Sequence, residues 1–481
     1  MFSRLCLTIV FATAAISSAS AASAKPNVLL ICVDDLRPAI GAFGDPHAKT
    51  PNIDRLAARG TAFQRAYVQY PVCAPSRIAL LSGFRPDELG IYELSTPMRS
   101  ARPDVVALPQ AFKLAGWHTE SIGKIYHTAH GNIDDALSWS VASWTPKGGP
   151  RPDARTRSSE AAGSRGKNGP AWYRPDVRDD ACADGQIGER GAERIAALAA
   201  AGQPFFLAVG FHKPHLPFIA PKRYWDLYDP ATLPVHPVDA VPPAGAPSWS
   251  RRGLGEVHSY RSSADPFTPA EARDLVHGYY ACVSFVDAQV GRLLDALDRS
   301  PAAKNTLIVF WGDHGFHLGD HGSWSKHTLF EPAPRAPPLV SAPGFRPRST
   351  AALAATIDLS PTLCEPAGLA APAGRSGRSL VPVMRDDGAT TRDHVITVMR
   401  RPREGGALLG RALRTDRHRY VEWRKLDAAR TLVAEELYDL EADPAESHNL
   451  AGQSAHAKLQ SILTARIAGL GRAADPVGKA E

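Results

Sequence analysis

The stretch PNVLLICVDD, residues 26–35, shows what kind of sheet this chain builds. It is apolar from Val28 to Val33 and ends in two aspartates. An uninterrupted apolar run of this length predicts a strand that is buried on both faces, as strands of parallel sheets are. Similar runs occupy Phe205–Val209 and Leu307–Trp311, and a weaker one occupies Thr119–Ile122. Helical patterns lie between the runs, at Asn52–Arg59, Leu108–Ala115, Gly188–Ala200 and Ala270–Asp298.

Strands that alternate with helices predict one large α/β domain with a mainly parallel sheet flanked by helices, and we assign it residues 25–374. Two long segments interrupt the alternation, at 141–180 and 228–268. Loops of this length in a compact domain are usually functional or mobile. From residue 375 the pattern changes to short β-type runs followed by a helix near 455–470. This predicts a smaller C-terminal α+β domain with an antiparallel sheet over residues 375–481.

The first 24 residues resemble an export signal. Arg4 supplies a positive charge, an apolar stretch of about a dozen residues follows, and Ala22-Ser23-Ala24 offers small residues for cleavage. The apolar stretch is too short to span a bilayer, so we expect an exported protein, periplasmic or secreted, without a stable membrane anchor. Five cysteines remain after cleavage; the number is odd, and the sequence leaves their pairing open.

Composition narrows the possible partners. The chain has 481 residues, of which 44% are hydrophobic and 22% charged, which excludes a mostly disordered protein. The formal charge of +6 is spread thinly, without the dense Lys/Arg runs that follow nucleic acid, so we expect no nucleic-acid partner. A mildly basic balance suits an anionic small molecule or a polyanionic glycan.

Residues that can bind a metal, carry charge or transfer a proton follow the predicted strands at the point where each strand ends. In open α/β sheets, ligands bind beyond the carboxyl ends of the strands. Each of these residues alone has an ordinary structural explanation. Because four separate strands place such residues at one edge of the sheet, we predict that they form a common site. The aspartates need a cation, and their oxygens suit Ca²⁺ or Mg²⁺, whereas the histidine beside the last aspartate also suits Zn²⁺. The residues are Asp34, Asp35, Lys124, His127, His212, Asp313 and His314.

A fifth element is Cys73-Ala74-Pro75-Ser76-Arg77. Pro75 suits the first turn of a helix, which would place Cys73 at the helix N-terminus, where free N–H groups favour an anion. Arg77 would lie one turn further on the same face. Taken by itself, Cys73 could also be a buried structural cysteine or a thiolate nucleophile paired with a histidine, as in cysteine hydrolases.

These residues resemble the type I sulfatases of the alkaline phosphatase superfamily, whose signature is C-x-P-S-R followed by a short helix and T/S-G. Here the signature ends at Ser82-Gly83. The resemblance extends through Gly123-Lys124 and His127, Asp313-His314-Gly315, Lys326 and a C-terminal Glu436-Leu437-Tyr438-Asp439. His212-Lys213-Pro214-His215 is similar to the iduronate-2-sulfatase branch. Phe316 departs from the tryptophan found there, which leaves the sugar open.

The resemblance implies an alkaline-phosphatase-like fold and sulfate ester hydrolysis on a sulfated saccharide. It implies that a formylglycine-generating maturation enzyme oxidises Cys73 to formylglycine. It further implies that residue 73 binds one Ca²⁺ together with Asp34, Asp35, Asp313 and His314. Arg77, Lys124 and Lys326 would stabilise negative charge, His127 would act as a base and His212 as an acid.

Three alternatives stay open at this point. A phosphodiesterase or phosphonate monoester hydrolase of the same superfamily would use similar residues. A catalytically dead, secreted glycan-binding protein would keep Cys73 as a thiol. A cysteine hydrolase would be sensitive to thiol alkylation and indifferent to chelators.

Overall fold

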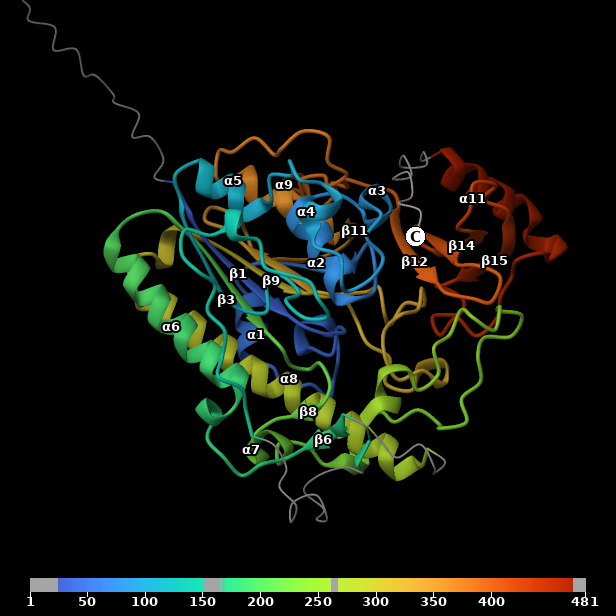
Figure 1. Cartoon of the computed structure of the whole chain (residues 1–481), viewed down its shortest axis with the longest axis horizontal. Helices are drawn as coiled ribbons and strands as arrows, with labels where there is room; N and C mark the ends of the chain where they lie inside the picture. Colours follow the sequence, from blue (N-terminus) through green and yellow to red (C-terminus); the bar gives the residue numbers. More distant parts are fainter. Residues whose placement is uncertain (1–24, 151–164, 167, 261–266, 470–481) are drawn as a thin grey trace, which may run out of the picture.

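Seven strands form the central sheet of the computed structural model, which describes residues 25–150, 165–166, 168–260 and 267–469 (Figure 1). The strand order is β11-β2-β10-β9-β1-β7-β3. All strands run parallel except β10, which is antiparallel to both of its neighbours. The bounds are β1 Asn27–Val33, β2 Thr61–Tyr67, β3 His118–Gly123, β7 Phe205–Phe211, β9 Thr306–Gly312, β10 Pro338–Ser341 and β11 Arg348–Ala355.

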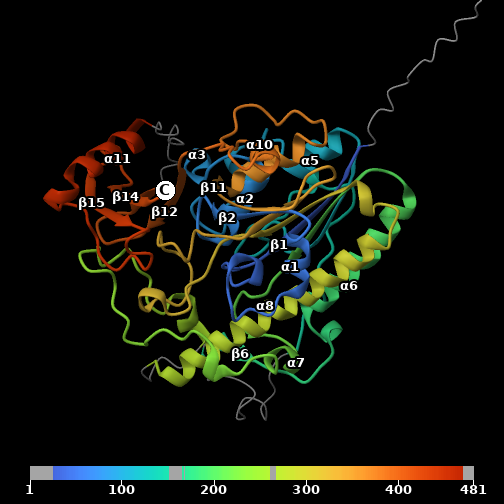
Figure 2. The same cartoon turned by 180° about the vertical axis from the view of Figure 1, so that it is seen from behind.

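Helices cover both faces of this sheet (Figures 1 and 2). Helices α1 (Pro51–Ala57), α6 (Ala183–Ala201) and α8 (Pro269–Asp298) lie on one face, and α2 (Cys73–Ser82), α5 (Leu108–Leu114) and α9 (Leu359–Cys364) lie on the other. Strand β1 is buried along its whole length because successive side chains enter opposite cores. Leu29 packs in the core on the α8 side and Leu30 in the core on the α2 side. The predicted parallel sheet flanked by helices is therefore confirmed.

A separate sheet forms the C-terminal part, drawn in orange and red beside the main body in Figure 1. Strands β12 (Val395–Arg401), β13 (Leu408–Arg414), β14 (His418–Lys425) and β15 (Leu432–Asp439) pair in sequence order, each antiparallel to the next. Helix α11 (Ala457–Gly469) packs against β14. The antiparallel C-terminal sheet is thus confirmed, while the domain boundary at residue 374 stays a prediction. Strand β12 meets the large domain directly, since Val398 N donates to Gln69 O over 2.9 Å.

The remaining elements are short. Segment 141–180 contains only β4 (Arg165–Gly166), β5 (Gly169–Pro170), β6 (Trp172–Tyr173) and a 3₁₀ turn, Asp179–Ala181, among its described residues. Segment 228–268 contains 3₁₀ turns at Pro230–Thr232 and Gly255–Tyr260. The other short α-helices and strands of the described residues are α3 (Pro86–Leu89), α4 (Met98–Ala101), α7 (Lys222–Trp225), α10 (Val381–Arg385) and β8 (Phe218–Ile219).

Several expectations need correction. Helix α6 begins at Ala183, five positions before the predicted Gly188. Gly185 counts against a helix from sequence, but it is needed there, because a Cβ on it would lie 1.9 Å from Asp179 O. Strands β2, β10 and β11 were not predicted from apolar runs; β2 carries the partly exposed Gln64 and Arg65, which break its pattern.

Two further expectations concern the N-terminal export signal and the pairing of the cysteines. The predicted signal segment, residues 1–24, lies outside the described residues. Within the described part of the chain, no helix is long and apolar enough to cross a membrane. Cys32, Cys73, Cys182, Cys282 and Cys364 are all buried and form no disulfide with one another.

Candidate active site

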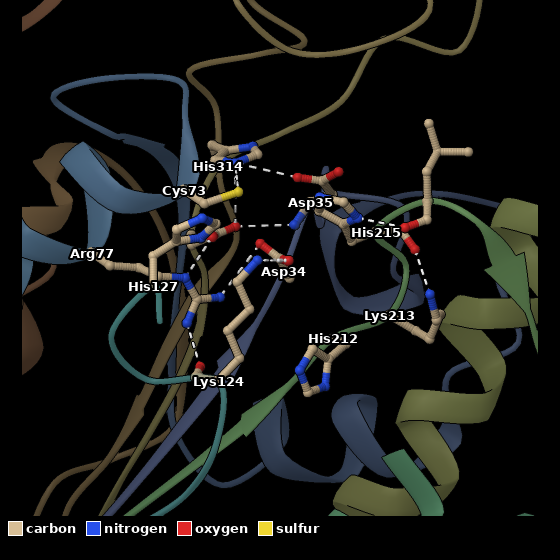
Figure 3. A network of polar contacts seen from close by, with 12 residues as sticks. Asp34, Asp35, Cys73, Arg77, Lys124, His127, His212, Lys213, His215 and His314 are labelled. Atoms are coloured by element: carbon tan, nitrogen blue, oxygen red, sulfur yellow. Dashed lines mark hydrogen bonds and ion pairs between the residues drawn. The ribbon is translucent and has the colours of Figure 1, made fainter. Parts of the chain in front are cut away.

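The carboxyl ends of four neighbouring parallel strands meet at one edge of the sheet. Strands β9, β1, β7 and β3 lie side by side in that order. Each is followed immediately by residues that the sequence singles out: Asp34 and Asp35 after β1, Lys124 and His127 after β3, His212 after β7, and Asp313 and His314 after β9. Figure 3 shows Asp34, Asp35, Lys124, His127 and His314 gathered around Cys73. The predicted common edge is therefore present.

Cys73 reaches this edge from a fifth strand. Because β10 is antiparallel to both β9 and β2, strand β2 runs parallel to β9 and ends at the same edge. After β2, Val72 is extended (φ −153°, ψ 141°) and α2 begins at Cys73. The helix ends at Gly83, which adopts the left-handed conformation (φ 76°) that glycine tolerates. Cys73 thus lies at the helix N-terminus, as Pro75 predicts.

The Cys73 thiol is surrounded by cationic groups. It is 1% exposed, and its Sγ lies 3.3 Å from His314 Nε2. Burial and the Asp34 carboxylate raise the pKa of Cys73, but Lys124, Lys326 and His314 lower it more strongly, so it lies well below the ordinary thiol value. A side chain at position 73 is therefore held where negative charge is stabilised.

Four buried residues, Cys73 among them, could hold a cation. Ligand atoms of Asp34, Cys73, Asp313 and His314 all lie within 4.8 Å of one another. Asp34 Oδ1 is buried without a hydrogen-bond partner among the described residues, so a lone pair is left for a cation. His314 Nδ1 lies 2.9 Å from Gly315 O and must donate to it, which directs Nε2 into the cluster.

Asp35 completes the cluster from the other side. With Asp34, Cys73 and His215 it forms a second set of ligand atoms within 4.8 Å. Its backbone N donates to Asp313 Oδ1 over 3.0 Å, which ties the two loops together. Its φ of 57° is a strained value for a non-glycine residue, and Tyr279 OH holds its carbonyl at 2.7 Å. Three carboxylates fit a hard divalent cation, and an oxygen at position 73 would strengthen that fit, whereas the imidazole of His314 also suits Zn²⁺.

Each carboxylate of the cluster also contacts at least one lysine or arginine side chain. Arg77 Nε donates to Asp313 Oδ2 over 2.7 Å, and Lys124 Nζ pairs with Asp34. Lys326 Nζ lies 2.9 Å from both oxygens of Asp35. Arg77 and Lys326 are almost completely buried, at 0% and 3% exposed. Three positive groups are thus fixed around position 73 in a region shielded from water, where charge interactions are strong.

The two predicted acid–base histidines occupy different settings. His127 is buried, its Nε2 lies 3.0 Å from His130 Nδ1, and the two rings stack. Burial lowers the pKa of His127, while the Cys73 thiolate opposes that shift. His212 is 38% exposed, and its Nδ1 lies 3.2 Å from Asp184 Oδ1. Its ring lies apart from Cys73 in Figure 3. His127 therefore lies buried beside residue 73, whereas the His212 side chain reaches solvent.

The sequence analysis did not identify two residues that the structure places at or beside the site. Glu256, from the long segment 228–268, pairs with Lys326 Nζ at 2.9 Å and with His215 Nε2 at 3.4 Å. Burial raises the pKa of Glu256, but Lys326 and His215 lower it to about 2. Asp184, near the start of α6, accepts the backbone N–H groups of His212 (2.9 Å) and Lys213 (2.7 Å). The unusual length of the segment was the one signal for Glu256, and no signal pointed to Asp184.

Comparison with known proteins identifies the family. The model of the family "Sulfatase" matches residues 26–369, which is most of the chain. The chain belongs to the sulfatase family. A second model, "N-sulphoglucosamine sulphohydrolase, C-terminal", matches residues 319–473. This sulfatase is 30% identical to the iduronate 2-sulfatase of Mus musculus over 541 aligned positions, covering 96% of this chain and 97% of the relative.

Solved structures confirm the alkaline-phosphatase-like fold. One is BT4656 in complex with D-glucosamine-2-N,6-O-disulfate, with a TM-score of 0.75, 21% identity and coverage of 95% of this chain and 100% of that one. Another is the phosphonate monoester hydrolase of Agrobacterium radiobacter, with a TM-score of 0.73, 22% identity and coverage of 92% and 95%. At these identities the structural likeness establishes the fold alone, and the substrate has to be inferred from the residues of the active site.

Proposed function

We propose that this sulfatase removes sulfate from a sulfated carbohydrate, using a formylglycine made from Cys73 and one Ca²⁺. The observation that carries the proposal is the burial of residue 73 among Arg77, Lys124 and Lys326, with its Sγ within 4.8 Å of ligand atoms of Asp34, Asp313 and His314. This arrangement provides a nucleophile position, a cation site and fixed positive charge in one place. The likeness to an iduronate 2-sulfatase supports a sugar substrate.

Residue 73 is placed for the chemistry that formylglycine supplies. A hydrated aldehyde offers two hydroxyls, one to attack sulfur and one to expel sulfate by re-forming the aldehyde, which neither cysteine nor serine can do. The chain's contribution is to hold this side chain at the start of α2, 3.3 Å from His314 Nε2. The cationic groups that lower the pKa of the Cys73 thiol would equally favour an ionised hydroxyl there.

Asp34, Asp35, Asp313 and His314, with the oxygen at position 73, would hold the Ca²⁺, which would supply positive charge to the ionised hydroxyl and to the sulfate oxygens. Without a cation, burial and the neighbouring Asp34 raise the pKa of Asp313 to about 7. Burial lowers the pKa of His314, but Asp313, Cys73 and Asp35 raise it to about 10. Both shifts favour additional positive charge beside Asp313 and His314, which a bound cation would supply.

The basic residues stabilise charge that develops on sulfate. Lys124 and Lys326 present ammonium groups from two sides of position 73, each anchored on a carboxylate. Arg77 is held at both ends of its guanidinium, by Asp313 on Nε and by the backbone oxygens of Lys124 and Ile125 on Nη1. Groups fixed this firmly need no reorganisation when the reaction proceeds, and this makes them effective.

The histidines move protons in this proposal. His127, next to residue 73 and kept neutral by burial, accepts a proton when sulfate is released. His212 donates a proton to the departing sugar oxygen, and the Asp184 carboxylate beside its Nδ1 keeps the ring oriented. A positioned acid of this kind contributes about 10²–10⁴-fold to the rate.

Export and maturation complete the proposal. The N-terminal sequence suits passage to the periplasm or the exterior, where sulfated polysaccharides are met. The partner required before activity is a formylglycine-generating enzyme that recognises the stretch from Cys73 to Arg77.

The test combines mass and substrate choice. Conversion of Cys73 to formylglycine lowers the intact mass by about 18 Da, so protein from a host with the maturation enzyme should show this loss. That protein should hydrolyse an aryl sulfate faster than an aryl phosphodiester or an aryl phosphonate. Faster phosphodiester or phosphonate cleavage would favour the rival hydrolase, and an unchanged thiol without turnover would favour the glycan-binding protein.

A further inference from the structure

A second histidine contacts the buried base of the active site and reaches solvent. His127 is 6% exposed and lies beside Cys73 (Figure 3), whereas His130, three positions along the chain, is exposed. His127 Nε2 and His130 Nδ1 lie 3.0 Å apart, which is hydrogen-bond distance, and the planes of the two rings differ by 13°. The proposed function gives His127 a proton to accept and leaves His130 without a role.

The hydrogen bond between the rings determines which nitrogen of His127 can serve as a base. A neutral imidazole carries its proton on one nitrogen and a lone pair on the other. His127 Nδ1 is buried and makes no hydrogen bond to a nitrogen or oxygen of the described residues. When His127 donates from Nε2 to His130, its Nδ1 keeps the lone pair, so Nδ1 is the nitrogen that remains for a hydroxyl at residue 73. His130 then carries its own proton on Nε2, the nitrogen that does not contact His127.

The backbone around His130 is built to hold its ring against His127. His130 (φ 57°) and Gly131 (φ 85°) both adopt the left-handed conformation, which few non-glycine residues tolerate. The Asn132 side chain, 7% exposed, donates to Leu94 O over 3.0 Å and anchors the turn. Backbone strain of this kind persists only where surrounding contacts impose it, and it is common at functional sites. The exposed imidazole is therefore kept in contact with His127.

A buried base needs a route by which its proton can leave. In the proposed function, His127 takes a proton from residue 73 each time sulfate is released, and it must lose a proton before the next turnover. His127 Nδ1 is buried and Nε2 is bonded to His130, so among the described residues the hydrogen-bonded route from His127 to solvent runs through His130. The 3.0 Å between the two nitrogens is within the roughly 2.6–3.2 Å over which groups exchange protons directly.

We propose that His130 relays the proton of His127 to solvent when sulfate is released; the inference rests on the proposed function. His127 Nδ1 takes the proton of the free hydroxyl at residue 73. The electron pair of that O–H bond forms the C=O bond, the bond between carbon and the sulfate oxygen breaks, and sulfate leaves with that pair. His127 passes its Nε2 proton to His130 Nδ1, and His130 gives its own Nε2 proton to water.

The same path resets both rings. When water adds back to the C=O bond, His127 returns its Nδ1 proton to the carbonyl oxygen, and the added water loses one proton to solvent. His130 takes a proton from water on Nε2 and returns its Nδ1 proton to His127 Nε2. His130 touches neither residue 73 nor the substrate in this scheme, and it acts entirely through His127.

The test is steady-state and rapid-mixing kinetics of the formylglycine-containing protein with an aryl sulfate. Ester cleavage precedes the relay, whereas sulfate release depends on it, so His130→Ala should keep kcat/KM and lower kcat. We expect a loss of about 10-fold or more, a part of the about 10²–10⁴-fold that a positioned proton transfer contributes. The variant should release one aryl alcohol per enzyme rapidly before slow turnover begins. Free imidazole in the buffer should restore kcat, because position 130 is exposed.

Two further variants separate a relay from a structural contact. His130→Gln keeps an oxygen that can accept the hydrogen bond from His127 Nε2 but cannot pass a proton on, so it should be as slow as His130→Ala. His448→Ala removes another exposed histidine, in the C-terminal part; it is the matched control and should keep the wild-type kcat. A His130→Gln enzyme as fast as the wild type would show that His130 only orients His127, and would overturn the relay.

A measurement without turnover checks the hydrogen bond itself. In Cys73→Ser protein made without the maturation enzyme, a serine hydroxyl takes the place of the formylglycine hydroxyl, and ¹⁵N NMR of labelled histidine should find His127 protonated on Nε2. Protonation on Nδ1 would overturn the relay and leave the sulfatase assignment standing. The same conclusion would follow from a His130→Ala enzyme with wild-type kcat, with kcat and kcat/KM lowered in proportion, or without a response to imidazole. Absence of wild-type turnover on every sulfate ester would overturn the proposed function, and the relay with it, even if the NMR result is as expected.

Discussion

Divalent cations should stabilise this protein against heat, and the Asp313→Asn variant should lose that effect. Asp313 is fully buried, and it belongs to the set of ligand atoms that lie within 4.8 Å of one another. A ligand that binds only the folded state adds about 2.7 kcal/mol to the free energy of unfolding at 100 times its Kd, and about 4.1 kcal/mol at 1,000 times. The substitution keeps the shape of the side chain and removes one negative charge from the site.

The size of the expected shift follows from chain length. At about 2.1 cal/mol/K per residue, the 481 residues have an unfolding entropy of about 1 kcal/mol/K. Saturating Ca²⁺ should therefore raise Tm by about 3 to 4 °C over the protein in chelator. Because cation ligands must be deprotonated and Asp313 has a pKa raised to about 7, a fixed Ca²⁺ concentration should give a larger shift at pH 8 than at pH 6.

The assay is thermal unfolding of the formylglycine-containing protein in chelator, Ca²⁺, Mg²⁺ or Zn²⁺. The matched control is Asp287→Asn, which removes a buried carboxylate that accepts hydrogen bonds from Asn52 and Ile53 outside the cluster. That control should keep the full Ca²⁺ shift. An unchanged Tm in every cation, or a shift that survives Asp313→Asn, would refute the cation site; a shift with Zn²⁺ alone would refute the choice of calcium.

The remaining predictions concern single side chains of the site. Cys73→Ala should abolish turnover while leaving the thermal unfolding of the cation-free protein close to that of the wild type; residual turnover would exclude residue 73 as nucleophile. Lys326→Ala should lower kcat about 100-fold or more, because a fixed positive charge near the sulfate is lost, and a near-normal kcat would show that the assignment is wrong. Asp184→Asn should slow sugar sulfates, whose leaving oxygen needs a proton, more than aryl sulfates with acidic leaving groups; equal slowing of both would argue against His212 as the acid.

The sequence predicts the reactive edge well because backbone geometry alone determines it. Strands that run parallel end at the same edge, so residues that directly follow them must converge. Val28–Val33 and Leu307–Trp311 are apolar throughout because both faces of the sheet are covered, and such runs are easy to recognise. Asp34 and Asp313 could thus be placed together without any knowledge of the loops.

The parts that the sequence misses depend on tertiary contacts. Strand β2 carries Gln64 and Arg65 on a partly exposed stretch, so its pattern resembles a loop, although it delivers Cys73 to the site. Glu256 reaches Lys326 from a segment of more than 40 residues whose described part forms no regular strand, and no local pattern specifies where such a segment folds back. Asp184 contacts His212 only because α6 begins beside the end of β7.

A count of buried charge supports the proposal that a divalent cation and a singly charged sulfate ester bind this site together. Four carboxylates face four basic groups around position 73, and these balance: Asp34 with Lys124, Asp35 with Lys326, Asp313 with Arg77, and Glu256 with His215. Burial and Lys326 lower the pKa of His215, but the carboxylates of Asp35, Glu256 and Asp34 raise it above its ordinary value, so that the ring takes up a proton more readily. An ionised hydroxyl at residue 73 and a sulfate monoester add one negative charge each, and a single divalent cation cancels both. Without the cation, two uncompensated charges would be buried, at a cost of several kcal/mol each. A phosphate monoester carries a second charge and would leave the filled site negative, whereas a phosphodiester would not. The charge balance therefore selects monoanionic esters and leaves the choice between sulfate and phosphodiester to the shape of the pocket.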